Sequence, residues 1–338
     1  MRIAIYGAGS LGTIMGAYLT KAGIPVEMIN RNKKHVEALK KNGAAVTGTV
    51  SMQVPVTAYL PEEMSGTYDI IFLMTKQLDN AATVTRLKEY LGRDGIICTL
   101  QNGLPEPEIA KIVGESRVMG CTVAWGATLK EPGVSELTSE PDSLSFGLGK
   151  MDQVPEKKME EVKEILEHMC PVEVEENFMG VRFSKLLINA AFSGMSAVLG
   201  CTFGEAAQDK RSRVCVQNLM KECMDVAEAA GIRIAPIQGK DVVRLLNYNN
   251  PVKKKISFLL IPIAIKKHAK LKASMLQDLE KGKPCEVDAI NGVVCQFGKK
   301  YHVATPYNDK VVEIIHGMEV GKGKPGFENL REFEGMKG

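Results

Sequence analysis

The chain has 338 residues, a formal net charge of +3 at pH 7 and 45% hydrophobic residues. Because domains usually contain about 100–200 residues, this length predicts two domains. A charged fraction of 25% is typical of folded globular proteins and excludes a disordered chain. The small net charge gives no reason to expect nucleic acid as a partner. The apolar stretch at 256–265 is far shorter than the about 20 residues of a membrane span, so no membrane partner is expected.

The first half of the chain alternates short apolar strands with helices. We expect strands at residues 2–6, 25–30, 69–75 and 95–100, and helices at 10–22, 33–42 and 80–91. This alternation predicts a parallel sheet that is covered on both faces by helices. Residues 118–148 change to short strand-like runs separated by Gly and Pro, which we expect at the edge of the same sheet.

A glycine-rich turn lies between the first expected strand and the first expected helix. It reads Gly7-Ala8-Gly9-Ser10-Leu11-Gly12 and fits the pattern G-x-G-x-x-G. In that motif the first glycine permits a tight turn, the second lets the backbone approach a pyrophosphate, and the third lets the helix pack against the strand. Free N–H groups at the helix start then bind phosphate. The strand–turn–helix context favours dinucleotide binding over a purely structural turn.

From residue 155 onward the pattern is almost wholly helical, apart from a short strand at 172–174. We therefore predict an α/β protein with a Rossmann-type dinucleotide-binding domain at 1–176 and an all-helical domain for substrate and dimerisation at 177–320. Residues 321–338 are rich in Gly, Lys and Glu and are expected to form a flexible tail.

The end of the second strand indicates which dinucleotide is bound. NAD sites usually place Asp or Glu there to accept hydrogen bonds from the ribose, but this sequence continues Asn30-Arg31-Asn32-Lys33-Lys34. With no carboxylate to repel a 2′-phosphate, and with the Arg31 guanidinium to bind it, NADP is favoured. Lys76, just after the strand at 69–75, adds a second positive charge. The alternative is that these side chains are the solvated start of a helix.

Lys185 and Asn189 lie four residues apart in an apolar helical segment, so their side chains share one helix face. Ser193 continues that face one turn later. A lysine and an amide in apolar surroundings are costly unless they are paired or line a cleft. A desolvated lysine also has a lowered pKa, which suits proton transfer near neutral pH. The alternative is that the Lys185 ammonium reaches solvent while Asn189 caps a neighbouring helix.

A second polar cluster lies about 90 residues later. Ser274 and Asp278 share a helix face, and Glu286 and Asp288 follow at the start of the next helix. Acidic residues in the first turn of a helix commonly complement its dipole. This pattern alone therefore does not separate a structural role from a catalytic one.

Taken together, the sequence resembles the ketopantoate reductase (2-dehydropantoate 2-reductase) family from residue 1 to about residue 316. The motifs that carry the resemblance are the Gly7–Gly12 turn, Arg31, Lys76, Gln101-Asn102-Gly103, the Lys185/Asn189 helix, Ser274-Met275-Leu276-Gln277-Asp278, Glu286-Val287-Asp288 and Pro306-Tyr307-Asn308. Their order and spacing are far more specific than any one of them.

The resemblance implies that NADPH reduces a 2-oxo acid to the 2-hydroxy acid in a cleft between the two domains. The implied substrate is ketopantoate, which becomes pantoate in pantothenate and coenzyme A biosynthesis. Lys185 is implied to be the general acid that protonates the carbonyl oxygen, and Glu286 to orient it. Asn102 is implied to lie near the nicotinamide ribose, and no metal is expected. The implied substrate-binding residues are Asn102, Asn189, Ser193 and Ser274.

Two departures from the family pattern leave the substrate open. Ser193 and Phe203 stand where the best-known members have asparagines, and residues 238–271 look like an insertion. A related 2-hydroxyacid or opine-type dehydrogenase is therefore one alternative. A non-catalytic NADP-binding sensor is another, although a sensor has no need of Lys185 and Glu286 in their positions.

The eight cysteines form no C-x-x-C pair and have no metal-site spacing. Without a recognisable export signal, we expect a cytoplasmic enzyme with reduced thiols.

The resemblance also implies a homodimer through the helical domain, with the apolar segment 258–265 as a candidate contact. The lysines at 253–255 and 266–267 are expected to form a solvated face, and the five histidines are assigned no role.

Overall fold

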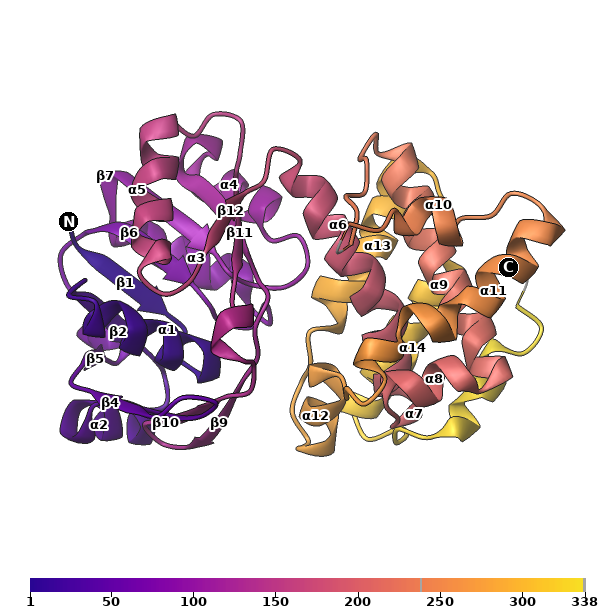
Figure 1. Ribbon diagram of the computed structural model, residues 1–338, viewed down its shortest axis with the longest axis horizontal. Helices are drawn as coiled ribbons and strands as arrows, with labels where there is room; N and C mark the ends of the chain where they lie inside the picture. The colour runs from indigo at the N-terminus through magenta and orange to yellow at the C-terminus, as the bar shows by residue number, and fades with distance from the viewer. Residues whose placement is uncertain (238, 337–338) are drawn as a thin grey trace. The chain divides into compact units, whose positions relative to one another are not determined.

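The computed structural model describes residues 1–237 and 239–336 (Figure 1). These residues form two compact units, Met1–Phe178 and Met179–Gly338. The division falls two residues after the boundary expected from the sequence. The predicted fold class, a Rossmann-type α/β unit followed by a helical unit, is confirmed.

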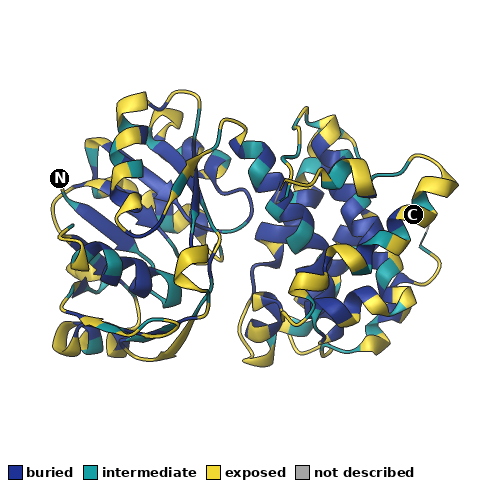
Figure 2. Ribbon diagram, viewed as in Figure 1, coloured by how far each residue is buried: buried dark blue, intermediate teal, exposed yellow. Residues whose placement is uncertain are grey.

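Unit 1 is built on one eight-stranded sheet in the order β12-β11-β8-β7-β6-β1-β2-β5. All neighbouring pairs in it are parallel except β11 and β8. The strands are β1 (Ile3–Tyr6), β2 (Val26–Ile29), β5 (Thr57–Tyr59), β6 (Tyr68–Leu73), β7 (Leu91–Thr99), β8 (Val118–Val123), β11 (Phe146–Lys150) and β12 (Val172–Val174). The central strands are buried because helices cover both faces (Figure 2).

Two apolar cores flank this sheet. One contains side chains of the first and last helices of the unit, such as Ile14, Met15 and Leu166. The other contains side chains of the middle helices, such as Val84 and Ile109. The helices of unit 1 are α1 (Ser10–Lys21), α2 (Lys33–Asn42), α3 (Asn80–Glu89), α4 (Glu106–Val113) and α5 (Glu156–Glu167).

A second, four-stranded sheet in unit 1 corrects the sequence-based expectation for residues 118–148. Its order is β4-β3-β10-β9, and it packs against α1. Its strands are β3 (Ala44–Gly48), β4 (Met52–Val54), β9 (Ala127–Glu131) and β10 (Val134–Leu137). Only β8 and β11 join the main sheet as expected, because β10 pairs in parallel with β3.

Unit 2 is helical and is organised around its longest helix, α9 (Lys210–Ala229), which contacts most of the others. The remaining helices are α6 (Phe178–Ile188), the π-helical turn η4 (Asn189–Ser193), α7 (Gly194–Leu199), α8 (Phe203–Gln208), α10 (Val242–Leu246), α11 (Pro251–Ala264), α12 (Ser274–Glu280), α13 (Val287–Tyr301) and α14 (Pro306–Glu319). Buried side chains along α9, including Cys215, Val216 and Leu219, form the centre of this unit.

The C-terminal segment does not fray over its whole length as expected. Residues Phe327–Phe333 form a short 3₁₀ helix, η6, which packs against α7, α9 and α14. Leu330 and Phe333 are buried there, and the Tyr307 ring stacks on the Phe333 ring. The Val198 carbonyl also accepts from the Gly326 N–H at 3.1 Å and from the Asn329 side-chain amide at 2.9 Å, so apolar packing and hydrogen bonds together hold the segment.

Across residues 1–237 and 239–336, every helix is too short or too polar to cross a membrane.

Candidate functional site

The glycine-rich turn connects β1 to α1 and requires glycine at two positions. Gly7 has a φ of +103°, and a Cβ there would lie 2.5 Å from the Thr75 backbone nitrogen. A Cβ at Gly12 would lie 2.7 Å from the Gly7 carbonyl oxygen. The N–H groups of Gly7 and Ala8 both donate to the Ile29 carbonyl at 3.0 Å. The turn is therefore pressed against the carboxyl ends of the neighbouring strands.

Gly9 differs from the other two glycines because the space beside it is open. A Cβ at Gly9 would meet nothing closer than the Gly7 oxygen, at 3.9 Å. Helix α1 begins at the next residue, Ser10, and no side chain caps its N-terminus. Its first N–H groups and its positive dipole end thus face an open space, which fits a pyrophosphate group. The residues present therefore suit a dinucleotide cofactor.

The tip of β2 holds the turn and also carries positive charge. The Asn30 side-chain amide donates to the Ala8 carbonyl at 2.8 Å, and its oxygen accepts from the Asn32 N–H at 2.8 Å. Arg31 is exposed between them. Burial raises the pKa of the nearby Tyr6 phenol, while the charges of Arg86 and Arg31 lower it. The carboxyl ends of β1 and β2 are therefore electropositive and lack the carboxylate of an NAD site.

His35, to which the sequence assigned no role, connects the glycine turn to the second sheet. The buried imidazole accepts from the Gly133 N–H at Nδ1 (3.0 Å) and contacts Thr13 Oγ1 through Nε2 (3.2 Å). Because Nδ1 accepts, the proton lies on Nε2, and the Thr13 hydroxyl can donate to the Ala8 carbonyl at 3.4 Å. Burial lowers the pKa of His35, which keeps the ring neutral.

Gln101 fixes the two loops that carry Lys76 and Asn102. Its amide donates to the Thr75 carbonyl and to Asn80 Oδ1, both at 2.9 Å, and its oxygen accepts from Thr99 Oγ1. Lys76 follows Thr75 in the chain and is exposed, whereas Asn102, which follows Gln101, is half-buried. Both predicted cofactor residues, Lys76 and Asn102, therefore lie at the carboxyl edge of β6 and β7. Gln101 positions them, although the sequence analysis quoted it only as part of a motif.

In unit 2, Lys185 is half-buried in the last turn of α6. The sequence predicted that its helix continues unbroken through Asn189 and Ser193, but residues Asn189–Ser193 form a π-helical turn. A π turn widens the helix and changes which side chains share a face, and such turns are frequent at functional sites. Ser193 is buried within it, and Asn189 is half-buried.

Asn291 stabilises this π turn from a distant part of the chain. A π turn breaks the usual pairing of carbonyls with N–H groups four residues later. The Ala190 carbonyl accepts instead from the Asn291 side-chain amide at 2.9 Å, and the same amide donates to Asn308 Oδ1 at 2.9 Å. Both asparagines are fully buried. The sequence analysis quoted only Asn308, as part of a motif, and gave neither residue a role.

Glu222 of α9 completes this buried network and was missed in the sequence. Its carboxylate accepts from the backbone N–H groups of Tyr307 (2.8 Å) and Asn308 (2.9 Å), and from the Asn308 side-chain amide (2.7 Å). It therefore caps the N-terminus of α14. In the sequence of the amphipathic helix α9, nothing distinguishes the buried Glu222 from the acidic residues that are exposed to solvent.

The Glu222 carboxyl predicts an unusual pH dependence of stability. Burial raises its pKa to about 7, although the three N–H donors lower it. Because the folded-state pKa lies above the ordinary value of 4.5, protonation of Glu222 stabilises the folded state. This contribution to the free energy of unfolding is complete below pH 4.5 and is lost as the pH rises through 7. Relative to Glu222→Gln, the wild type should lose about 2–3 kcal/mol of unfolding free energy between about pH 5 and about pH 8.

Urea unfolding of both proteins at the two pH values measures this difference. Glu228→Gln, an exposed carboxyl on the same helix, is the matched control and should show the pH dependence of the wild type. If Glu222→Gln also keeps that dependence, Glu222 is not the titrating group.

Helices α12 and α13 both pack against the π turn and carry the remaining predicted residues. Ser274 is the first residue of α12 and is exposed, and the N–H of Ala273 before it donates to Ser196 Oγ at 3.2 Å. Glu286 immediately precedes α13 and is only 8% exposed, and its side chain does not cap that helix. Asp288, in contrast, is an exposed ion-pair partner of His316 at 3.0 Å.

Phe203, one of the two departures from the family pattern, is part of the core. It is 7% exposed, and its ring lies 5.7 Å from the Phe192 ring, which belongs to the π turn. Its backbone N–H donates to the Leu271 carbonyl at 3.0 Å. This residue therefore supports the π turn by packing against it.

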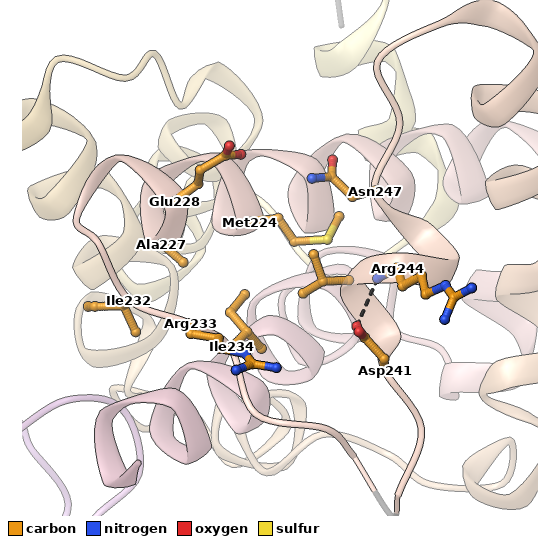
Figure 3. A pocket seen from close by; sticks show the side chains of 10 residues that line it. Met224, Ala227, Glu228, Ile232, Arg233, Ile234, Asp241, Arg244 and Asn247 are labelled. Atoms are coloured by element: carbon orange, nitrogen blue, oxygen red, sulfur yellow. Dashed lines mark hydrogen bonds between the residues drawn. The ribbon is translucent and has the colours of Figure 1, made fainter.

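A separate cavity of about 440 Å³ lies beside α9 and α10 (Figure 3). Residues that line it include Met224, Ile232, Arg233, Asp241, Val243 and Arg244. The Asp241 carboxylate accepts the Arg244 backbone N–H there at 2.9 Å, which caps α10. The predicted substrate residues do not line this cavity.

Each unit thus gathers its own share of the predicted residues. In unit 1 the glycine turn, Arg31, Lys76 and Asn102 follow the carboxyl ends of neighbouring strands β1, β2, β6 and β7. In unit 2 the elements that carry Lys185, Asn189, Ser193, Ser274 and Glu286 pack around the π turn. Among residues 1–237 and 239–336, no group of three or more His, Cys, Asp and Glu side chains is placed to hold a metal ion.

A glycine turn at the carboxyl edge of a parallel sheet is the arrangement of dinucleotide-binding proteins, and here a helical unit with a half-buried lysine follows it. The family model "Ketopantoate reductase PanE/ApbA" matches residues 3–150, and its C-terminal counterpart matches residues 177–319. The chain therefore belongs to the ketopantoate reductase family, and the expectation of an oxidoreductase of that family is confirmed.

Comparisons with individual proteins agree with this assignment. The 2-dehydropantoate 2-reductase of Pyrococcus horikoshii is 28% identical over 328 residues, covering 94% of this chain and 98% of that protein. A structure of D-mandelate dehydrogenase with NADH and anilino(oxo)acetate has a TM-score of 0.81 at 24% identity, covering 95% of this chain and 99% of that one. A dimeric ketopantoate reductase from Staphylococcus aureus has a TM-score of 0.72 at 18% identity, covering 96% and 100%. The two structural likenesses show a shared fold.

Proposed function

We propose that this protein uses NADPH to reduce a 2-oxo acid to the 2-hydroxy acid, with ketopantoate as the substrate and pantoate as the product. That reaction belongs to pantothenate and coenzyme A biosynthesis. The observation that carries the proposal is the position of Lys185, half-buried and one helical turn before the π turn that contains Asn189 and Ser193. A non-catalytic sensor has no need of this arrangement.

In the proposed reaction, bound NADPH supplies the hydride that reaches the carbonyl carbon of the substrate. The Lys185 ammonium donates a proton to the carbonyl oxygen, and its charge stabilises the negative charge that develops there. Glu286 orients the lysine. The amide of Asn189 and the hydroxyls of Ser193 and Ser274 bind substrate oxygens, and Asn102 contacts both cofactor and substrate.

The choice of NADPH rests on the tip of β2. In place of the usual Asp or Glu, Asn30 is engaged in holding the Ala8 carbonyl, and Arg31 is exposed beside it. A 2′-phosphate would therefore meet a guanidinium and, from Lys76, an ammonium group. The D-mandelate dehydrogenase structure contains NADH, so cofactor preference is a property that this chain must be tested for directly.

Turnover tests the proposal. Purified protein is mixed with NADPH and ketopantoate, and the loss of NADPH absorbance is followed. Rapid turnover supports the full proposal. Turnover only with other 2-oxo acids, such as the 2-oxo acid that is reduced to mandelate, contradicts ketopantoate as the substrate. The protein would then be a 2-hydroxyacid dehydrogenase with another substrate. Tight NADPH binding without turnover on any of them would favour the sensor.

Replacing Arg31 with alanine should raise the KM for NADPH about 10- to 100-fold, because charge-assisted hydrogen bonds to the 2′-phosphate are lost. The KM for NADH should change much less, since NADH has no phosphate at that position. Lys33→Ala, which removes an exposed positive charge two residues away, is the matched control. Equal effects of Arg31→Ala on both cofactors would show that Arg31 does not bind the 2′-phosphate.

Two further expectations belong with this proposal. The eight cysteines are all buried and none is joined in a disulfide, which supports a reducing cytoplasmic location. A homodimer also stays a prediction, which light scattering of the purified protein tests. The dimeric reductase from Staphylococcus aureus is a precedent for two-copy assembly on this fold.

A further inference from the structure

Helix α11 has an exposed apolar stripe on the side opposite its buried face. Val252, Ile256, Leu259 and Ile263 are 68%, 50%, 65% and 68% exposed. Their spacing of four, three and four residues places them on one narrow face of a helix with 3.6 residues per turn. Ser257 and Ile261, each 1% exposed, lie on the opposite face and pack into unit 2.

The segment that contains this stripe is strongly basic. Between Asp241 and Asp278 there are eight Lys and Arg residues and no Asp or Glu. The whole chain has a net charge of +3, so the remaining residues sum to −5. Exposed lysines lie at both ends of the stripe, Lys253 and Lys255 at one end and Lys266 and Lys267 at the other, whereas Lys254 lies over the Tyr248 ring. Positive charge and exposed aliphatic side chains are thus concentrated on the same element.

Pairing of α11 with itself across a dimer does not fit that surface. Pairing α11 with α11 of another copy would place lysines against lysines in either orientation, and like charges across an interface are unfavourable. Within the segment 258–265, suggested by sequence as a dimer contact, Ile261 and Ile265 are buried in the unit's own core. The Phe258 ring lies under the Arg213 guanidinium at 4.7 Å.

We infer that α11 is a membrane-surface helix that binds anionic lipid bilayers. The apolar stripe would enter the boundary between headgroups and acyl chains, and the exposed lysines at its two ends would bind the anionic headgroups. A bilayer surface matches both the charge and the stripe and needs no groove complementary to a convex helix. With 14 residues, α11 would lie along the surface.

Vesicle flotation of the full-length protein tests this inference. Vesicles of phosphatidylcholine alone are compared with vesicles of equal parts phosphatidylcholine and phosphatidylglycerol, at low and at high salt. The bound fraction should be at least about tenfold higher on the anionic vesicles and should fall as salt is added. Absence of binding to anionic vesicles at low salt would overturn the inference.

Two pairs of substitutions separate the contributions of stripe and charge. Ile256→Ser with Leu259→Ser, and Lys266→Glu with Lys267→Glu, should each lower anionic-vesicle binding about tenfold or more. The matched controls are Leu129→Ser, which is 40% exposed in unit 1, and Lys111→Glu with Lys157→Glu, both exposed there. These should bind as the wild type does.

The same variants distinguish the bilayer from a protein partner. Mass measurement by light scattering should be unchanged by the stripe substitutions. If they instead convert a dimer into a monomer while vesicle binding is absent, the stripe joins two copies and the inference is wrong. Because the assay needs neither NADPH nor a 2-oxo acid, its outcome is independent of the proposed reductase activity.

Discussion

Replacing Lys185 with alanine should lower kcat about 100- to 10,000-fold, the usual range for loss of a general acid. The physical reason is that the carbonyl oxygen gains negative charge as hydride reaches the carbon, and Lys185 supplies both the proton and the stabilising charge. Helix α6 should be preserved, since alanine has the highest helix propensity. NADPH affinity should change little, because the proposed cofactor residues are all in unit 1.

Steady-state kinetics together with NADPH binding measure this effect. Lys221→Ala, which removes a lysine from α9 in the same unit, is the matched control and should keep the wild-type kcat. Unchanged kcat in Lys185→Ala would exclude its role as the acid. A loss of folding, detected by circular dichroism, would show instead that Lys185 is structural, and Lys185→Met would then separate the aliphatic stem from the charge.

Replacing Gly9 with valine should raise the dissociation constant for NADPH at least about 100-fold while lowering thermal stability less than Gly12→Ala does. Gly9 has a φ of −85° and a ψ of −141°, which lies outside the regions that residues with a Cβ favour, although a Cβ there meets only open space. The valine methyl groups would occupy the volume assigned to the pyrophosphate. The predicted loss corresponds to about 3 kcal/mol of binding free energy.

Gly12→Ala is the informative contrast for this experiment. Its Cβ would lie 2.7 Å from the Gly7 oxygen, so the substitution should destabilise the fold of unit 1 and lower its melting temperature. Together the two variants separate a cofactor role from a folding role. If Gly9→Val binds NADPH as tightly as the wild type, the turn does not hold the pyrophosphate.

The sequence predicted the main sheet, apart from its edge strand β5, and the glycine turn because their signals are local. The spacing of Gly7, Gly9 and Gly12 and the apolar strands around them are determined by backbone geometry and burial within a short segment. The strands β3 and β4 had no such signal, since they are short, partly exposed and have no clear alternation. The pairing of β10 with β3 joins segments about 90 residues apart, which no local pattern records.

The candidate site in unit 2 shows a similar division. Lys185 and Asn189 could be selected from the sequence because polar residues stood out in an apolar helix. The π turn could not, because the Ala190 carbonyl is held by Asn291, 101 residues later. Glu222 could not either, since only the fold reveals that it caps α14.

The hydrogen bond from Gly133 to His35 means that the cofactor turn is not a local structure, although its motif is. The residues proposed to bind phosphate are complete by position 12, but the partner that fixes the supporting imidazole is 98 residues beyond His35. A nascent chain whose β9–β10 hairpin has not yet left the ribosome would have the glycine motif but would lack the hydrogen bond from Gly133 to His35. The turn would then reach its binding-competent form only after most of unit 1 has been synthesised.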